Sequence, residues 1–292
     1  MRRLAPILAG GGALLLTGAT APKSQAVPPE VLRRSMIEAG VCRATDRCAP
    51  TPERIARLLA TAKATEQWQP VPPPVTPGPA GAPPSDAVVL FDGTSLDAWR
   101  SVDDRGPARW RIGERVLIPD KATGNIETRR TFRNYQLHLE WRIPADIDGT
   151  GQGRGNSGVF LAATGPEDAG YELQILDSWR NPTYVNGQAA SLYKQAPPLV
   201  NAALPPGAWQ SYDVIWTAPR SDARGTLLRP AYATVLHNGV LVQNHVALKG
   251  ETIFVGRPFY RAYERAPIKL QAHRDPSAPV SFRNIWIRDL PD

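Results

Sequence analysis

Hydrophobic and polar residues alternate along most of the chain from residue 88 onward. Gly, Pro, Asn or Asp bounds each short run, and helical periodicity is nearly absent. Because successive side chains of a strand point to opposite faces, alternation with a period of two predicts strands. The candidate strands are 87–91, 110–112, 116–118, 136–143, 157–162, 171–176, 210–216, 231–236, 240–246, 268–272 and 280–287.

These candidate strands are short, closely spaced and separated by turn residues. About eleven strands in roughly 200 residues are typical of an all-β fold, either a two-sheet sandwich or a jelly roll. We therefore expect one β-sandwich domain over residues 87–292. This region has no cysteine, so its stability must come from its hydrophobic core.

Residues 27–68 show a different pattern, which predicts a short helical segment. The sequence Pro-Pro-Glu at 28–30 can start one helix. The sequence Thr-Pro-Glu at 51–53 can start a second, with Thr as the N-cap, Pro at the first helical position and an acid in the first turn. The hydrophobic residues expected on one face of the second helix are Ile55, Leu58 and Leu59.

The two cysteines of the chain, Cys42 and Cys48, lie between these helices. In an oxidising compartment a cysteine pair that closes a short loop forms a disulfide. A metal site would need more ligands nearby, and the first histidine of the chain is His138. We therefore predict a structural disulfide between Cys42 and Cys48.

The first 26 residues have the pattern of a secretory signal peptide. A basic start is followed by a largely apolar stretch over 4–19, and Ser24-Gln25-Ala26 supplies small residues at the cleavage positions. The alternative is a retained membrane anchor, for which the apolar run is short and rich in glycine. We expect cleavage after about Ala26, a periplasmic or secreted protein, and no membrane span in the mature chain.

Composition changes the picture in two places. Residues 69–86 include a 16-residue stretch in which half the positions are proline, which predicts an extended linker and a domain boundary. Removing Arg2, Arg3 and Lys23 from the 34 basic residues leaves 31 against 27 acidic ones, a net charge of +4. The basic residues are scattered, so no nucleic-acid partner is expected.

Candidate chemistry lies on the polar faces of three predicted strands. These faces carry acids, amides and histidine rather than the Lys, Thr and Ser of an ordinary solvated face. Large acid and amide side chains on a sheet suit hydrogen bonding to sugar hydroxyls, so a small-molecule carbohydrate is the expected partner. The polar residues singled out are Glu140, Glu172, Gln174, Gln271 and His273. An exposed sheet surface with no ligand is the alternative reading.

Two loop residues extend this set. Asn156 follows a glycine-rich loop, which lacks the lysine and spacing of a phosphate cradle, and serves either as a turn residue or as a ligand-binding residue. Among the tryptophans, Trp179 is the best candidate to stack on a sugar ring, because it follows the Glu172 strand in a polar loop.

An ordered set of motifs also carries a family resemblance. The motifs are Phe91-Asp92-Gly93-Thr94-Ser95-Leu96, Gly124-Asn125-Ile126-Glu127-Thr128, Asn156-Ser157-Gly158-Val159-Phe160-Leu161, Tyr171-Glu172-Leu173-Gln174-Ile175-Leu176-Asp177, Leu192-Tyr193-Lys194, Leu270-Gln271-Ala272-His273 and Phe282-Arg283-Asn284-Ile285. In this order they resemble the 3-keto-disaccharide hydrolase domain family over about 88–290. The resemblance implies a concanavalin-like two-sheet fold and the processing of 3-keto-glycosides, with Tyr193 as a further substrate-binding candidate.

Such chemistry has clear requirements. A ketone at C3 acidifies the C2 proton, a base removes it, and the group on C1 is then expelled with help from an acid. Glu172 and His273 are the candidates for proton transfer, with Asp177 as a third catalytic candidate. Gln174, Gln271, Asn156 and Lys194 are candidates for holding hydroxyls or the carbonyl. A divalent cation could bind through Glu172, Asp177 or His273, although the spacing does not require one.

Two other functions remain open at this point. The segment from Glu172 to Asp177 resembles the catalytic strand of laminarinase-like hydrolases, which use two carboxylates. However, Gln174 replaces the central acid, and strict alternation points Asp177 away from Glu172 unless a bulge intervenes. A non-catalytic, lectin-like sugar-binding module is the second alternative, since a fold does not determine an activity.

Overall fold

The computed structural model describes residues 27–292, and the predicted signal peptide, 1–26, lies outside them. The chain divides into two compact units, one ending at Pro73 and the other spanning Pro74–Asp292. Within the described part, no helix has the length and apolar character that crossing a bilayer requires.

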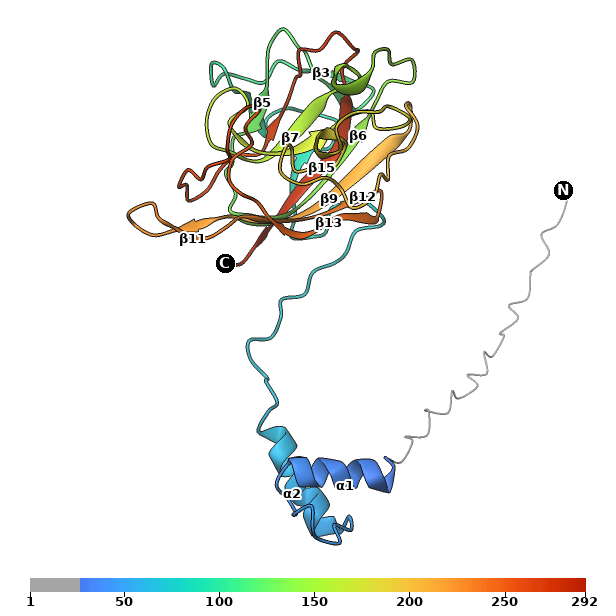
Figure 1. Ribbon diagram of the computed structural model, residues 1–292, viewed down its shortest axis with the longest axis vertical. Helices are drawn as coiled ribbons and strands as arrows, with labels where there is room; N and C mark the ends of the chain where they lie inside the picture. Colours follow the sequence, from blue (N-terminus) through green and yellow to red (C-terminus); the bar gives the residue numbers. More distant parts are fainter. Residues whose placement is uncertain (1–26) are drawn as a thin grey trace, which may run out of the picture. The chain divides into compact units, whose positions relative to one another are not determined.

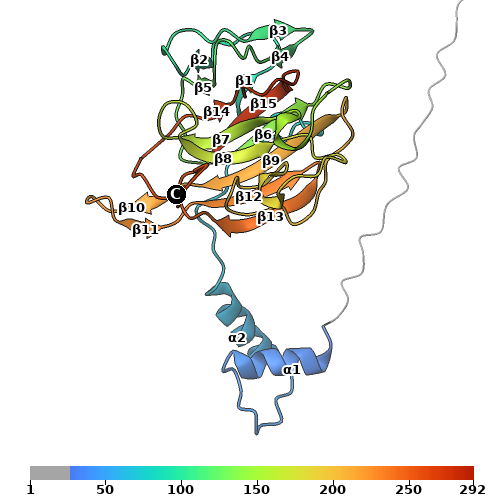
Figure 2. The same ribbon diagram turned by 45° about the horizontal axis from the view of Figure 1, so that its top comes forward.

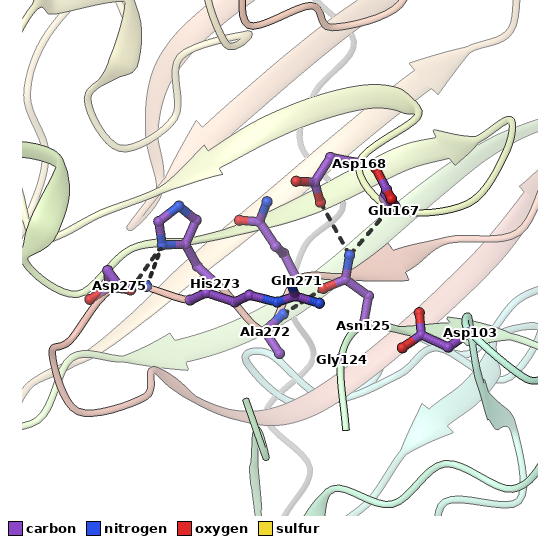
Figure 3. A pocket seen from close by; sticks show the side chains of 10 residues that line it. Asp103, Gly124, Asn125, Glu167, Asp168, Gln271, Ala272, His273 and Asp275 are labelled. Carbon is purple, nitrogen blue, oxygen red and sulfur yellow. Dashed lines mark hydrogen bonds and ion pairs between the residues drawn. The ribbon is translucent and has the colours of Figure 1, made fainter. Parts of the chain in front are cut away.

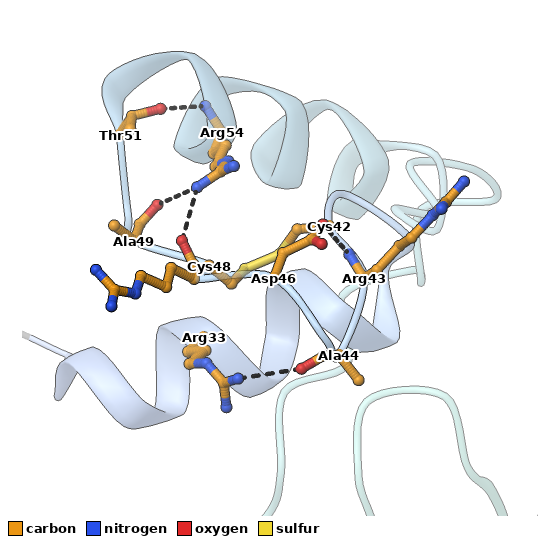
Figure 4. Close-up of a disulfide and its surroundings, with 10 residues drawn as sticks. Arg33, Cys42, Arg43, Ala44, Asp46, Cys48, Ala49, Thr51 and Arg54 are labelled. Atoms are coloured by element: carbon orange, nitrogen blue, oxygen red, sulfur yellow. Dashed lines mark hydrogen bonds between the residues drawn. A yellow bond between two sulfur atoms is a disulfide. The ribbon is translucent and has the colours of Figure 1, made fainter.

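The first unit is a pair of short helices, α1 (Pro29–Glu38) and α2 (Pro52–Lys63). Thr51 caps α2 as expected, because its hydroxyl accepts a hydrogen bond from the Arg54 backbone N–H. A disulfide joins Cys42 and Cys48, and the Arg54 side chain donates to backbone carbonyls of the same loop (Figure 4).

The core of this unit is very small. Met36, Val41 and Cys48 are its buried members, and Leu58 packs against them from α2. Leu59, expected on the same face, is instead 57 % exposed. A single neighbouring helix covers too narrow a stripe of α2 to bury both leucines.

The second unit is a sandwich of two antiparallel sheets, which confirms the predicted all-β fold (Figure 1, Figure 2). The eight-stranded sheet has the order β13-β12-β9-β6-β15-β4-β3, with β1 on β15: β1 (Val88–Phe91), β3 (Arg111–Gly113), β4 (Val116–Ile118), β6 (Asn134–Arg142), β9 (Trp209–Thr217), β12 (Tyr232–His237), β13 (Val240–Ala247) and β15 (Ser281–Leu290). The five-stranded sheet has the order β2-β5-β14-β7-β8: β2 (Trp99–Ser101), β5 (Ile126–Thr128), β14 (Lys269–Leu270), β7 (Ser157–Ala163) and β8 (Gly170–Ile175).

Smaller elements complete the second unit. β10 (Arg220–Ser221) and β11 (Leu227–Arg229) form a hairpin that projects from the edge of the sandwich in both views (Figure 1, Figure 2). Two 3-10 turns, η1 (Gly151–Gly153) and η2 (Val185–Gly187), lie in the loops that flank β7 and β8. The sequence pattern did not predict β2, β5, β10 and β11, each of which has two or three residues.

Alternation directs the hydrophobic residues of both sheets into one core. Leu137, Leu139 and Trp141 of β6 are fully buried there, as are Leu173 and Ile175 of β8. Each fully buried aliphatic side chain of this size contributes about 1.5–3 kcal/mol. The sheets are also joined by hydrogen bonds across the core, since the Tyr212 hydroxyl donates to the Gln174 carbonyl at 2.8 Å. The polar residues of β8 therefore sit on a strand held firmly from behind.

The predicted linker is not uniform, because residues from Pro74 onward belong to the second unit. The Gly81 carbonyl accepts hydrogen bonds from the Asn284 amide at 2.7 Å and the Trp286 indole at 3.0 Å. Proline cannot donate to a sheet, but the carbonyls of a proline-rich strand can accept from side chains on a sheet face. The second half of the predicted linker thus lies against the eight-stranded sheet.

Candidate functional site

The outer face of the five-stranded sheet carries polar side chains in rows across the strands. In one row, Glu127 pairs with Lys269, Lys269 with Phe160, and Phe160 with Glu172. In the next row, the Gln271 backbone N–H bonds to Gly158, which pairs with Gln174. Residues far apart in the sequence therefore meet because β14 lies between β5 and β7.

Two adjoining hollows lie over this face. The aromatic hollow, about 410 Å³, is lined by Gln152, Asn156, Asp168, Glu172, Gln174, Tyr184, Tyr193, Lys194, Thr252, Phe254, Gln271 and His273. The acidic hollow, about 480 Å³, is lined by Asp103, Gly124, Asn125, Glu167, Asp168, Gln271, Ala272, His273, Arg274 and Asp275 (Figure 3). Asp168, Gln271 and His273 line both, so the two hollows form one groove.

Most of the candidates from the sequence meet in the aromatic hollow. They are Glu172, His273, Asn156, Gln174, Tyr193, Lys194 and Gln271. Glu140, Asp177 and Trp179 line neither hollow.

Glu172 is buried at the floor of the aromatic hollow, with 5 % of its surface exposed. Its carboxylate lies directly over Gly158, where a Cβ atom would come within 2.5 Å of Oε1. Burial, and secondarily the charge of Asp168, raise the pKa of Glu172 to about 8, although Lys269 acts in the opposite direction. A carboxyl group with this pKa can exchange a proton near neutral pH.

The His273 ring is held in place by the neighbouring residue Asp275. Its Nδ1 lies 2.9 Å from Oδ2 of Asp275 and 3.1 Å from the Asp275 backbone nitrogen. Figure 3 marks both contacts. Burial would raise the pKa of Asp275, but hydrogen bonds from His273 and Ser277, with the charge of Lys121, lower it to about 2. The ionised Asp275 thus fixes the ring, and Nε2 remains for other contacts.

Lys194 sits among aromatic rings at the opposite wall. Its ammonium lies 4.3 Å from the Tyr184 ring centroid and 5.1 Å from that of Phe254. The hydroxyls of Tyr184 and Tyr193 are 2.6 Å apart, and burial together with that contact raises the pKa of Tyr193. The hollow therefore offers a cation and a neutral phenol, both suited to an electron-rich oxygen.

Amide groups line the remaining wall. The Gln174 amide donates to Oδ1 of Asn156 at 3.1 Å, and the Asn156 amide donates to the Gln152 carbonyl at 2.8 Å. Gln271 is 6 % exposed, and its Oε1 has no hydrogen-bond partner within residues 27–292. Buried amides are normally satisfied, so Gln271 has capacity for a ligand.

Three predicted site residues, Asp177, Trp179 and Glu140, lie outside both hollows. Asp177 is 2 % exposed, forms an ion pair with Arg154 at 2.7 Å and lines neither hollow. Trp179 has Arg180 over its ring and lines neither hollow.

Glu140 is on β6, in the other sheet, where Arg283 donates to it at 2.6 Å. Alternation correctly places Glu140 on a polar face, but that face belongs to the opposite side of the sandwich. Among the described residues, no cluster of three or more His, Cys, Asp or Glu side chains is arranged to hold a metal ion.

Sequence reasoning did not select Lys269 or Asp168 as site residues. Lys269 is fully buried, and its ammonium donates to the carbonyls of Gly165, Glu167 and Ala169 in the β7–β8 turn. Burial lowers the pKa of Lys269 to about 8, while Asp168 and other acids oppose this. The lysine anchors the turn that carries Asp168. In the sequence, Lys269 and Gln271 alternate with the apolar Leu270, so their shared face could be predicted. The sequence of the turn did not indicate that Asp168 belongs to the site.

Comparisons with known proteins cover the part of the chain that carries this groove. Residues 86–288 match the family model described as a 3-keto-alpha-glucoside-1,2-lyase-like domain. A 3-keto-disaccharide hydrolase from Bacteroides thetaiotaomicron is 26 % identical over 157 residues, which cover 44 % of this chain and 51 % of that protein. The chain therefore matches only about half the length of this relative.

Solved structures share the fold. A candidate glycosyl hydrolase from Parabacteroides distasonis has a TM-score of 0.73 and 46 % identity, covering 78 % of this chain and 96 % of that one. A second one from the same organism, with a TM-score of 0.50 and 19 % identity, covers 70 % and 94 % and shows the shared fold alone.

Proposed function

Because the chain belongs to the family of 3-keto-alpha-glucoside-1,2-lyase-like domains, we propose that it cleaves the glycosidic bond of 3-keto-glycosides. The observation that carries the proposal is the buried carboxyl of Glu172, with its pKa raised to about 8, at the floor of a groove that His273 also lines. A proton-transfer pair of this kind suits elimination from a ketone better than it suits binding alone.

The proposed reaction has two stages. Glu172 removes the C2 proton, and the electron pair is delocalised onto the C3 oxygen. The enolate then forms a C1–C2 double bond as the C1–oxygen bond breaks, and His273 gives a proton to the departing oxygen. Water afterwards adds its hydroxyl to C1 and gives its remaining proton to His273, and Glu172 returns a proton to C2. The sum is hydrolysis of the glycosidic bond.

Each group has a role consistent with its surroundings. At pH 7 a carboxyl of pKa about 8 is ionised in about one molecule in ten, but this fraction is a stronger base than an ordinary carboxylate. In the proposed mechanism, Lys194 and Tyr193 stabilise the C3 oxygen as it gains charge. Gln174, Asn156 and Gln271 provide hydrogen bonds for sugar hydroxyls.

The test compares a 3-keto-disaccharide with its unoxidised parent in D₂O. Elimination and hydration should cleave the keto-sugar alone and leave one solvent deuterium at C2 of the released sugar. The released sugar incubated without enzyme controls for spontaneous exchange. Cleavage of the parent would refute the mechanism, and binding of the keto-sugar without turnover would indicate a sugar-binding module.

Substitution tests the assigned base. Glu172→Gln should lower kcat by about 10²–10⁴-fold, the usual contribution of a positioned general base. Glu140→Gln is the matched control, because Glu140 lies on the other sheet and should leave kcat unchanged. The two-carboxylate mechanism is not favoured, since Asp177 is paired with Arg154 outside the groove.

We also propose that the protein works outside the cytoplasm. The pattern of residues 1–26 and the Cys42–Cys48 disulfide support this, because disulfides persist in oxidising compartments. Fractionation of expressing cells, with N-terminal sequencing, should find a mature chain that begins near Val27. A full-length chain retained in the cytoplasm would overturn the proposal.

A further inference from the structure

We propose that the acidic hollow binds the leaving group of the substrate, and that its carboxylates select neutral or cationic leaving groups against anionic ones. This inference rests on the proposed function and adds to it the class of glycoside that is cleaved. It follows from the positions of the two proton-transfer groups and from the residues that line each hollow.

The first argument concerns the bond that breaks. Glu172 lines the aromatic hollow only, so C2 of the keto-sugar must lie there. His273 lines both hollows, and the oxygen that it protonates must lie where they meet. The C1–oxygen bond therefore crosses the boundary, and the departing group enters the acidic hollow.

The second argument is that the acidic hollow is already built. The Asn125 amide donates to Oδ1 of Asp168 at 3.1 Å and to the Glu167 carbonyl at 3.2 Å, while its Oδ1 accepts from the Ala272 backbone at 2.9 Å. These bonds join the β7–β8 turn to the segment after β14. Figure 3 shows the Gln271 amide pointing into the space between His273 and Asp168. Gln271 is a buried side chain with an unpartnered oxygen, so a hydrogen-bonding ligand is expected at this point.

The third argument is that the two hollows are lined by different kinds of side chain. Tyr184, Tyr193 and Phe254 supply aromatic rings to the aromatic hollow, whereas the acidic hollow has none. Carboxylates of Asp103, Glu167 and Asp168 line the latter, and Arg274 is the cation set against them. Asp275 is already bound by Lys121.

The lining residues determine which leaving group fits. Hydroxyl and ammonium groups can donate to carboxylates, whereas an anionic group would be repelled by them. The structure therefore favours a hydroxyl-rich or amino sugar as the leaving group over a uronic acid or a sugar phosphate.

The experiment uses three 3-keto-glucosides that differ only in the leaving sugar: a neutral hexose, a 2-amino-2-deoxyhexose and a hexuronic acid. Values of kcat/KM are measured at low and high salt. We expect kcat/KM for the uronic acid compound to be at least ten-fold lower than for the neutral one, and this ratio to move toward one at high salt. The substitutions Asp103→Asn and Glu167→Gln should also move the ratio toward one. Glu264→Gln is the matched control, because Glu264 lies outside both hollows, and it should leave the ratio unchanged.

The outcomes separate the two proposals. Equal kcat/KM for all three compounds, or a preference for the uronic acid, would overturn the leaving-group inference and leave the proposed function standing. A discrimination that Asp103→Asn and Glu167→Gln leave unchanged would also overturn it. If none of the three compounds is cleaved, the proposed function fails, and this inference fails with it.

Discussion

Replacing Glu172 with glutamine should make the protein more stable at alkaline pH while lowering the kcat of its proposed reaction by about 10²–10⁴-fold. In the folded protein the pKa of Glu172 is raised from 4.5 to about 8, chiefly by burial. The folded state therefore holds the proton more tightly than the unfolded state. As pH rises from about 4.5 to about 8, the free energy of unfolding falls, because the folded protein must keep a proton or bury a charge.

The size of the effect follows from the two pKa values. Each pH unit between them costs about 1.4 kcal/mol, so the wild type loses about 4 kcal/mol between pH 5 and pH 9 through this one group. Glu172→Gln does not titrate and avoids this loss. A constant difference from altered hydrogen bonding shifts the whole curve and leaves its pH dependence unchanged.

Urea unfolding followed by tryptophan fluorescence measures this difference, and the chain has eight tryptophans. The difference in unfolding free energy between Glu172→Gln and the wild type should grow in favour of the variant from pH 5 to pH 9. Glu140→Gln is the control. Burial raises the pKa of Glu140, but Asn284 and Arg283 outweigh it and lower that pKa, so its contribution is present above about pH 4.5 and is lost as pH falls. Parallel curves for Glu172→Gln and the wild type would refute the raised pKa.

Three further predictions follow from the site. The kcat/KM of the wild type should rise with pH, reach half its maximum near pH 8 and level off above that, because Glu172 must be ionised to act as the base; a profile that falls over this range would make Glu172 the acid. Gly158→Ala places a methyl group 2.5 Å from Oε1 of Glu172, so kcat should drop at least ten-fold while the far-ultraviolet circular dichroism spectrum stays unchanged; full activity would show that the carboxylate position is not critical. Lys269→Met leaves three carbonyls of the β7–β8 turn without their donor, so stability should fall by about 2 kcal/mol and KM should rise as the turn carrying Asp168 moves, measured by thermal unfolding and steady-state kinetics; unchanged KM would contradict the anchoring role.

Much of the site was accessible from local pattern. Glu172 and Gln174 alternate with buried Leu173 and Ile175, and a strand with one buried face must present them together on the other. The same argument placed Gln271 on the polar face of its strand, opposite the buried Leu270. It failed for Glu140, because alternation tells which residues share a face of one strand but not which sheet that strand joins.

Loop contributions were not accessible in the same way. Tyr184, Phe254 and Asp168 reach the groove from turns that show no periodicity. Asp177 illustrates the converse, since its place in a motif suggested catalysis, whereas the fold pairs it with Arg154 and leaves it out of the lining of both hollows. A long-range ion pair depends on where two distant segments are brought by folding.

By itself, the sequence determined the all-β class, the strand faces, the capped second helix and most of the polar residues over Glu172. These follow from interactions within a few residues, namely side-chain alternation, turn chemistry and capping. Only the tertiary structure decided that β14 lies between β5 and β7, that Lys269 anchors the turn bearing Asp168, and that burial raises the pKa of Glu172 to about 8. Strand order and burial arise from packing between segments distant in the chain, which no local pattern records.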